Sequence, residues 1–363
     1  MAHPSASLID PQMIQNVLLI NTIVLGVCGL SYFYGDPKGH RSIDKLHHLC
    51  FLSIPRYMTL FLSRVLGDQK AKNISSFFED FFTKPNPTVF YLYLILSVGG
   101  YTLFVIYGYP ELPNPVVPWE HHKVTGFLLF FVTVTLFIKS SVDDPGVITK
   151  SNHQAILETY PADGTIFPKT TKLPEICRTC SLPKPARSKH CSTCNRCIKR
   201  FDHHCIWINQ CVGAGNVGSF LMFLLANNAL CLYGSYLGCG IIQHWIEDLG
   251  LATAVFRDRI TGEVYSASWY YIAVYMMGNH KPIVFLTMFC TIIGVVLLWF
   301  TWYHWVTLMR CGLTTNEDIK IGRIKPRVDK AMTVYNRGSW LHNCMETFSR
   351  KDPRSTIVSL GKR

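Results

Sequence analysis

Long apolar runs separated by polar segments are the main pattern along this chain of 363 residues. A membrane-spanning helix needs about 20 mostly apolar residues to cross about 30 Å of hydrocarbon. Five runs reach or approach that length: 13–34, 88–107, 122–140, 217–242 and 282–309. The third is bounded by Lys123 and Lys139, whose long side chains can reach water from a helix end. The pattern predicts an α-helical polytopic membrane protein with about five transmembrane helices.

The first run has an alternative interpretation as a cleaved signal peptide. A signal peptide has a positively charged segment before a short apolar core. No Lys or Arg precedes residue 13, and the apolar run is too long for such a core. We therefore expect the run to be retained as a span.

The Lys and Arg residues are concentrated in alternate segments between the spans. Residues 35–84, 139–216 and 310–363 hold 31 of the 35. Loops rich in Lys and Arg lie on the cytosolic side of a membrane. We therefore expect lumenal segments at 1–12, 108–121 and 243–281, and cytosolic segments at 35–87, 141–216 and 310–363. Within the first cytosolic segment, the stretch from Leu46 to Leu66 mixes apolar and basic residues and predicts an interfacial helix.

Composition agrees with this class of protein. Hydrophobic residues make up 49% of the chain and charged residues only 16%, which excludes a disordered or fibrous protein. The net charge of +12 could indicate nucleic-acid binding, but the topology already accounts for the excess of Lys and Arg. The spans carry almost no ionisable groups at depth, which argues against a transporter.

Seven of the 14 cysteines lie between Cys177 and Cys211, with three histidines among them. Three overlapping Cys-x2-Cys pairs with nearby histidines are typical of tetrahedral zinc sites. A disulfide framework is the alternative, but the cluster falls on the reducing cytosolic side. Two sites of three cysteines and one histidine would leave one Cys and one His over. Such a pair can form a thiolate nucleophile and its base, although spacing alone does not say which residues are spare.

Asp202-His203-His204-Cys205, within this pattern, resembles the DHHC family of integral-membrane protein S-acyltransferases, the palmitoyltransferases, and within it the type-4 subgroup. The motif-rich match covers about residues 174–220. Asp144-Pro145-Gly146 and Thr314-Thr315-Asn316-Glu317 resemble two further family motifs. The family core has four spans, so 13–34 is an additional one. Asn209-Gln210-Cys211 departs slightly from the commoner Asn-Asn-Cys.

The resemblance implies roles for individual residues. Cys205 is the nucleophile, His203 its base, and Asp202 orients the histidine. Thr314, Thr315 and Glu317 pack against the zinc domain. Two structural zinc ions are implied, with these ligand sets: Cys177, Cys180, His190 and Cys197; and Cys191, Cys194, His204 and Cys211.

The implied reaction transfers a long-chain acyl group from acyl-CoA, such as palmitoyl-CoA, through Cys205 to cysteines of client proteins near the membrane. Lys184, Arg187 and Lys189 are candidate contacts for the CoA phosphates, or alternatively for lipid headgroups. Endoplasmic reticulum or Golgi is the expected compartment, with the active site facing the cytosol. The bilayer is an expected partner and nucleic acid is not.

A membrane-anchored zinc module that only recruits a partner is the competing hypothesis. It would need the eight ligands but neither His203 nor Cys205, so their presence favours the enzyme. Two smaller expectations concern other residues. Asn227 and Asn228, at mid-depth of a span, are expected to bond between helices rather than line a cavity. Trp207 could shield the nucleophile, but a buried core position is the favoured expectation.

Overall fold

The computed structural model describes residues 53–84, 86–159, 176–257, 262–324, 336 and 338–349, together with residues 42, 45, 48 and 49. The predicted span 13–34 lies outside these residues. The chain divides into two compact units, one formed by residues 1–83 and 250–279 and the other by 84–249 and 280–363.

The first unit contains a helical pair and a short hairpin. Helix α3 (Ile54–Leu66) has a proline in its first turn and ends at Gly67, whose φ of 82° suits glycine. Helix α4 (Asp68–Thr83) follows directly. Strands β5 (Val255–Arg257) and β6 (Val264–Ser266) are antiparallel, and Phe256 and Tyr265 both stack on Tyr271 of α9 (Trp269–Asn279). The predicted interfacial helix from Leu46 to Leu66 thus overlaps α3.

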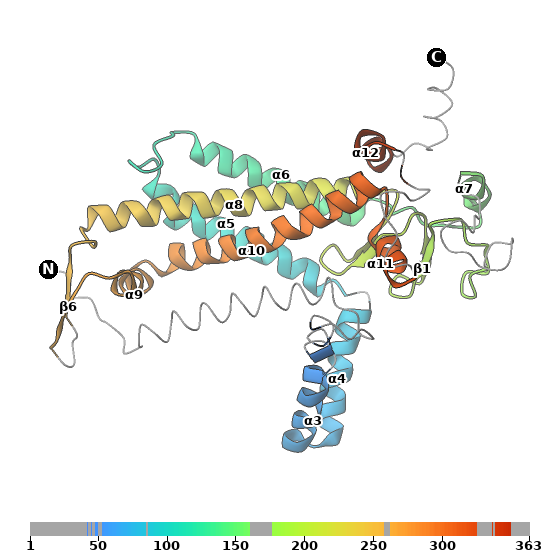
Figure 1. Cartoon of the computed structure of the whole chain (residues 1–363), viewed down its shortest axis with the longest axis horizontal. Helices are drawn as coiled ribbons and strands as arrows, with labels where there is room; N and C mark the ends of the chain where they lie inside the picture. The colour runs from blue at the N-terminus through green and yellow to red at the C-terminus, as the bar shows by residue number, and fades with distance from the viewer. Residues whose placement is uncertain are drawn as a thin grey trace, which may run out of the picture. The chain divides into compact units, whose positions relative to one another are not determined.

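Four helices of the second unit are long and apolar enough to cross a membrane: α5 (Thr88–Tyr107), α6 (His122–Val142), α8 (Val217–Asp248) and α10 (Lys281–Trp305). A five-residue π-helical segment, η3 (Val306–Arg310), continues α10. Figure 1 shows the four helices side by side, with the cysteine-rich strands, α11 and α12 gathered at one end. These four helices make the protein an integral membrane protein.

Helix α8 packs closely against α10 because small residues face larger ones. A Cβ at Gly238 would overlap the hydroxyl of Thr287. Small residues let membrane helices approach, and polar groups then bond across the contact. Asn228 Nδ2 donates to the carbonyl of Gly294 at 3.2 Å, and Tyr93 donates to Asn227 Oδ1 at 3.2 Å. Both asparagines therefore bond between helices, as predicted.

The cysteine-rich domain is built from two hairpins, each formed by two strands of three residues. Strands β1 (Lys189–Cys191) and β2 (Arg196–Ile198) pair antiparallel, as do β3 (His203–Cys205) and β4 (Gln210–Val212). A short helix, α7 (His153–Thr159), precedes them. The Asp144-Pro145-Gly146 turn joins α6 to this domain: Asp144 accepts from the N–H groups of Gly146 and Val147, and Gly146 accepts from Lys199.

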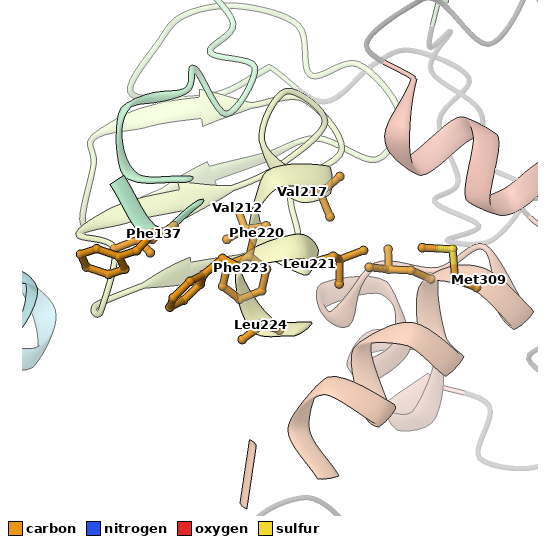
Figure 2. Close-up of a cluster of buried hydrophobic side chains, with 10 residues drawn as sticks. Phe137, Val212, Val217, Phe220, Leu221, Phe223, Leu224 and Met309 are labelled. Atoms are coloured by element: carbon orange, nitrogen blue, oxygen red, sulfur yellow. The ribbon is translucent and has the colours of Figure 1, made fainter. Parts of the chain in front are cut away.

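A buried apolar cluster connects the second hairpin to the helices. Figure 2 shows Phe137 of α6, Val212 of β4, Phe220 and its neighbours on α8, and Met309 of η3. Ile208 and the partly buried Cys205 pack against the same cluster. Because this cluster removes apolar surface from water, it fixes β3 and β4 at the end of the helices.

Two C-terminal helices pack against the same end. Helix α11 (Thr315–Ile324) and α12 (Trp340–Phe348) follow η3. Glu317 of α11 forms a bidentate pair with Arg187 of the cysteine-rich domain, both contacts at 2.7 Å, and the two side chains are 1% and 3% exposed. Glu346 of α12 lies 3.4 Å from Arg187 and 3.8 Å from Arg200. Asn343 Nδ2 donates to the Met309 carbonyl at 2.9 Å.

Replacing Glu317 should strongly destabilise this end of the protein. Glu317→Gln keeps the volume but leaves the buried Arg187 charge without its main partner, at a cost of about 3–5 kcal/mol. A denaturant titration of the purified protein, followed by tryptophan fluorescence, would measure the change. Glu247→Gln is the matched control, because it makes the same substitution at an exposed position near the C-terminal end of α8. Equal stability of the two variants would contradict the buried pair.

Candidate active site and metal centres

The first metal-ligating group consists of Cys177, Cys180, His190 and Cys197, whose donor atoms all lie within 4.8 Å of one another. The three sulfur atoms are 3.5, 3.4 and 3.8 Å from His190 Nδ1. A tight turn closes the Cys177-x2-Cys180 pair, in which Cys180 N–H points to Cys177 Sγ and Ser181 N–H to the Cys177 carbonyl. His190 and Cys197 face each other across the β1–β2 hairpin.

The second group consists of Cys191, Cys194, His204 and Cys211, again with donor atoms within 4.8 Å. Cys194 Sγ lies 3.3 Å and Cys211 Sγ 3.7 Å from His204 Nδ1, and the two sulfurs are 3.5 Å apart. His204 and Cys211 are partners across the β3–β4 hairpin. Adjacent residues His190 and Cys191 thus serve different groups, which ties the two hairpins into one domain.

Both groups fit zinc. Zn–S bonds of about 2.3 Å and Zn–N bonds of about 2.05 Å in a tetrahedron place sulfur and nitrogen about 3.6 Å apart. The observed separations scatter around that value, and three thiolates with one imidazole form a common structural zinc set. Each group offers four protein ligands, so it would be closed to substrate. The structure therefore brings together the two predicted ligand sets.

The alternation of side chains along β3 separates the metal-ligating His204 from His203 and Cys205. Successive side chains of a strand point to opposite faces, so His203 and Cys205 share one face while His204 points to the other. His203 hydrogen-bonds to Cys205, and its Nδ1 donates to Asp202 Oδ2 at 2.6 Å. The second oxygen of Asp202 accepts from the backbone N–H of Thr315 at 2.7 Å. The predicted nucleophile, base and orienting acid therefore form one chain of contacts.

The charges and hydrogen bonds among Asp202, His203 and Cys205 favour a Cys205 thiolate beside a His203 imidazolium. Burial alone would lower the pKa of His203, but its hydrogen bonds to Asp202 and Cys205 and their charges raise it to about 10. Burial likewise would raise the pKa of Cys205, but the hydrogen bond and charge of His203 bring it below its ordinary value. For Asp202, burial is outweighed by the hydrogen bond and charge of His203, so its pKa lies below the usual range.

The loop after Cys205 adds two donors and an exposed indole. The backbone N–H groups of Ile208 and Trp207 both bond to the Cys205 sulfur, which further favours its charged form. Trp207 is 46% exposed, so the prediction that it is buried was wrong. The apolar cluster is filled instead by Ile208, one residue later.

Two residues of the same loop attach it to the membrane helices. Gln210, the cross-strand partner of Cys205, donates through Nε2 to the carbonyls of Ser141 and Asp143 at 2.9 and 3.1 Å. These carbonyls lie at the end of α6, where helix acceptors have no partner within the helix. Asn209 Oδ1 accepts from Asn86 N–H, just before α5, at 3.1 Å. In the sequence, Gln210 stood out only as a small departure from the family pattern, and this contact was not predicted.

The three basic residues proposed as CoA contacts lie in different surroundings. Arg187 departs from the prediction, because its guanidinium is buried against Glu317, Glu346 and the Gly312 carbonyl and is not open to a phosphate. Lys189 is exposed, with its Nζ 5.0 Å above the Phe201 ring, and Lys184 is partly exposed. A CoA contact from these two lysines stays a prediction. The available sequence signal for this buried ion pair was Glu317, an acidic residue in a predominantly basic C-terminal segment.

A further residue at the site, His304, was not predicted from the sequence. It lies near the end of α10, is 2% exposed, and its Nδ1 is 4.0 Å from Asp202 Oδ2. A histidine close to the end of an apolar run was the available signal, since ionisable residues in membrane helices are often functional.

Removal of one ligand should distinguish the metal centres from the nucleophile. Cys180→Ala should reduce the zinc content from two ions per chain to about one and destabilise the domain, because metal binding there contributes folding free energy. Cys205→Ser should keep both ions. Elemental analysis of the two purified variants measures this directly. If Cys205→Ser lost zinc while Cys180→Ala kept it, the ligand assignment would be wrong.

Comparison with known proteins points to one family. The family model described as DHHC palmitoyltransferase matches residues 170–322. The chain is 31% identical over 302 residues to palmitoyltransferase swf1 of Schizosaccharomyces pombe, which covers 82% of this chain and 78% of that protein. It is 34% identical over 240 residues to palmitoyltransferase ZDHHC4 of Bos taurus, with 65% and 66% covered, in agreement with the resemblance to the type-4 subgroup. The chain therefore belongs to the DHHC palmitoyltransferase family.

Proposed function

We propose that this protein S-acyltransferase works through an acyl-enzyme on Cys205, with His203 moving the proton and Asp202 holding His203. The enzyme class follows from family membership. The observation that carries the residue assignment is the arrangement of β3, where His203 and Cys205 share one face and the intervening His204 belongs to a metal group.

The chemistry follows from the protonation states. The Cys205 thiolate attacks the carbonyl carbon of the acyl-CoA thioester and forms a new C–S bond. The C–S bond to CoA breaks, and the leaving CoA sulfur takes the proton from His203. His203 then takes the proton of a client cysteine thiol, whose sulfur attacks the acyl-enzyme. The second step releases Cys205 and leaves the acyl chain on the client. A covalent intermediate of this kind gives ping-pong kinetics.

The two zinc ions have a structural role in this proposal. When bound, they fix the four protein ligands of each group and supply folding free energy. His204 directly precedes Cys205 and Cys211 follows six residues later, so one metal group holds both ends of the nucleophile loop. Gln210 and Asn209 hold the same loop against α6 and α5.

The substrates and setting are part of the proposal. A long acyl chain is as apolar as lipid, so it suits the ends of the helices next to Cys205, whereas the CoA headgroup would stay in water near Lys184 and Lys189. Client proteins would present cysteines close to the bilayer surface. The distribution of Lys and Arg supports an active site facing the cytosol. We place the protein in the endoplasmic reticulum or Golgi.

The competing function, a zinc module that only recruits a partner, predicts no covalent chemistry. It gives no reason for a buried Asp202–His203 pair beside a cysteine of lowered pKa. Perturbed groups of this kind are typical of catalytic sites.

Incubation with palmitoyl-CoA should produce a single acyl adduct on the detergent-purified protein. We expect intact-protein mass spectrometry to show an adduct on the wild type that hydroxylamine removes, because the bond is a thioester. Cys205→Ser, with two zinc ions retained, should show none. An adduct that persists in this variant would place the nucleophile elsewhere, and no adduct on either protein would favour the recruitment module.

Asp202→Asn should slow acyl-enzyme formation by about 10²–10⁴-fold, since it removes the charge that keeps His203 oriented and protonated. Single-turnover quench experiments with palmitoyl-CoA measure this rate. Asp144→Asn, outside the Asp202–His203–Cys205 chain of contacts, serves as the control. A rate within twofold of the wild type for Asp202→Asn would show that the carboxylate is not needed.

A further inference from the structure

His304 extends from a membrane helix into the Asp202–His203 pair. It is the next-to-last residue of α10, and the π-helical segment η3 begins two residues later. A π-helical segment widens the helix and is often found at functional sites. The widened segment leads to Thr315, the first residue of α11.

The ring of His304 contacts the ring of His203 directly. Their centroids are 5.5 Å apart with an interplanar angle of 36°. Phe220 touches both, at 5.3 Å from His203 and 5.7 Å from His304, in edge-on geometry. Phe300 packs against His304 from one turn earlier on α10, at 4.4 Å. His203 is therefore bounded by Phe220 and His304, and His304 is itself held by Phe220 and Phe300.

His304 also reaches Asp202 through Thr315. Its Nδ1 is 3.4 Å from Thr315 Oγ1, within hydrogen-bond distance. The backbone N–H of the same threonine donates to Asp202 Oδ1 at 2.7 Å. The 4.0 Å between His304 Nδ1 and Asp202 Oδ2 is too long for a hydrogen bond, so His304 does not compete with His203 for that oxygen.

We propose that His304 is a positioning residue for the acyl transfer: it holds the His203 ring by contact, and it holds Asp202 through Thr315, so that His203 faces Cys205. The inference rests on the proposed roles of Cys205 and His203. A burial role alone would be met by any ring of similar size, whereas this role also requires the polar atom at the δ position.

Variants at position 304 separate these two requirements. His304→Phe keeps a ring against His203 and Phe220 but removes Nδ1, whereas His304→Asn loses the ring and keeps a polar δ atom able to bond Thr315. Thr315→Val removes the hydroxyl and leaves the backbone donor to Asp202 in place. His280→Phe, just before the other end of α10, is the matched control, since His280 stacks on Trp245 far along the sequence from the site.

Three readouts are measured on the full chain in detergent: zinc content, single-turnover acylation at several palmitoyl-CoA concentrations, and the rate of Cys205 alkylation by iodoacetamide. We expect His304→Phe to keep two zinc ions and its half-saturating palmitoyl-CoA concentration, while acylation and alkylation both slow roughly tenfold. His304→Asn should recover part of this loss. Thr315→Val should slow acylation and alkylation as much as His304→Phe does. The double variant with both substitutions should be no slower than either single variant, because both remove the same contact.

Other results would overturn the inference. A higher half-saturating concentration with unchanged alkylation would make His304 a substrate contact. Loss of zinc from both His304→Phe and His304→Asn would make it only structural. Acylation and alkylation rates of Thr315→Val equal to those of the wild type, with His304→Phe slow and zinc retained in both, would exclude the contact through Thr315. If the wild type forms no acyl adduct, the proposed function fails, and the alkylation rates still decide whether His304 positions the groups around Cys205.

Discussion

A single buried carboxylate holds the active end of this protein together. Asp202 is almost fully shielded from water, and a buried charge is stable only when both of its oxygens are bonded. One oxygen accepts a hydrogen bond from His203, and the other accepts one from the backbone N–H of Thr315 at the start of α11. The start of a helix favours negative charge. The cysteine-rich domain and the C-terminal segment therefore meet at the same carboxylate that bonds His203.

The metal-ligating groups have a different role, which is to hold the three-residue strands in place. A hairpin of two such short strands has too few hydrogen bonds to be stable alone. In both hairpins a histidine and a cysteine of one metal group are direct cross-strand partners. The alternation of the strand places His204 in the metal group and turns its two neighbours, His203 and Cys205, to the other face, where the proposed chemistry would take place. His203 and Cys205 can lie on one face and His204 on the other because side chains alternate along a strand with a period of two.

The sequence predicted most local features of this architecture, and the family resemblance also implied that Thr315 and Glu317 pack against the cysteine-rich domain, which the structure confirms. Several other long-range contacts were missed. Apolar run length indicated the four long helices, since a helix must cover the hydrocarbon by itself. Cys-x2-Cys spacing indicated the metal groups, because both ligands lie in one turn. In contrast, Arg187 was a candidate contact for CoA phosphates or lipid headgroups, although it pairs with Glu317, 130 residues away. Gln210 reaches Ser141 at the end of α6, 69 residues away, and His304 contacts His203 of β3 from the far end of α10. No periodicity records such contacts, since they depend on how the elements pack.

The position of Cys205 suits its proposed role as nucleophile toward an acyl-CoA substrate, because such a substrate is part apolar and part charged. The acyl chain belongs in an apolar environment and the phosphates belong in water, so the thioester between them must meet the enzyme where the two environments join. Cys205 lies against the apolar cluster of Phe137, Phe220 and Phe223, while the loop that carries it also exposes Trp207. Gln210 and Asn209 bond that loop to the ends of α6 and α5. The depth of the thiol is therefore set by the helices, and the zinc groups set its direction.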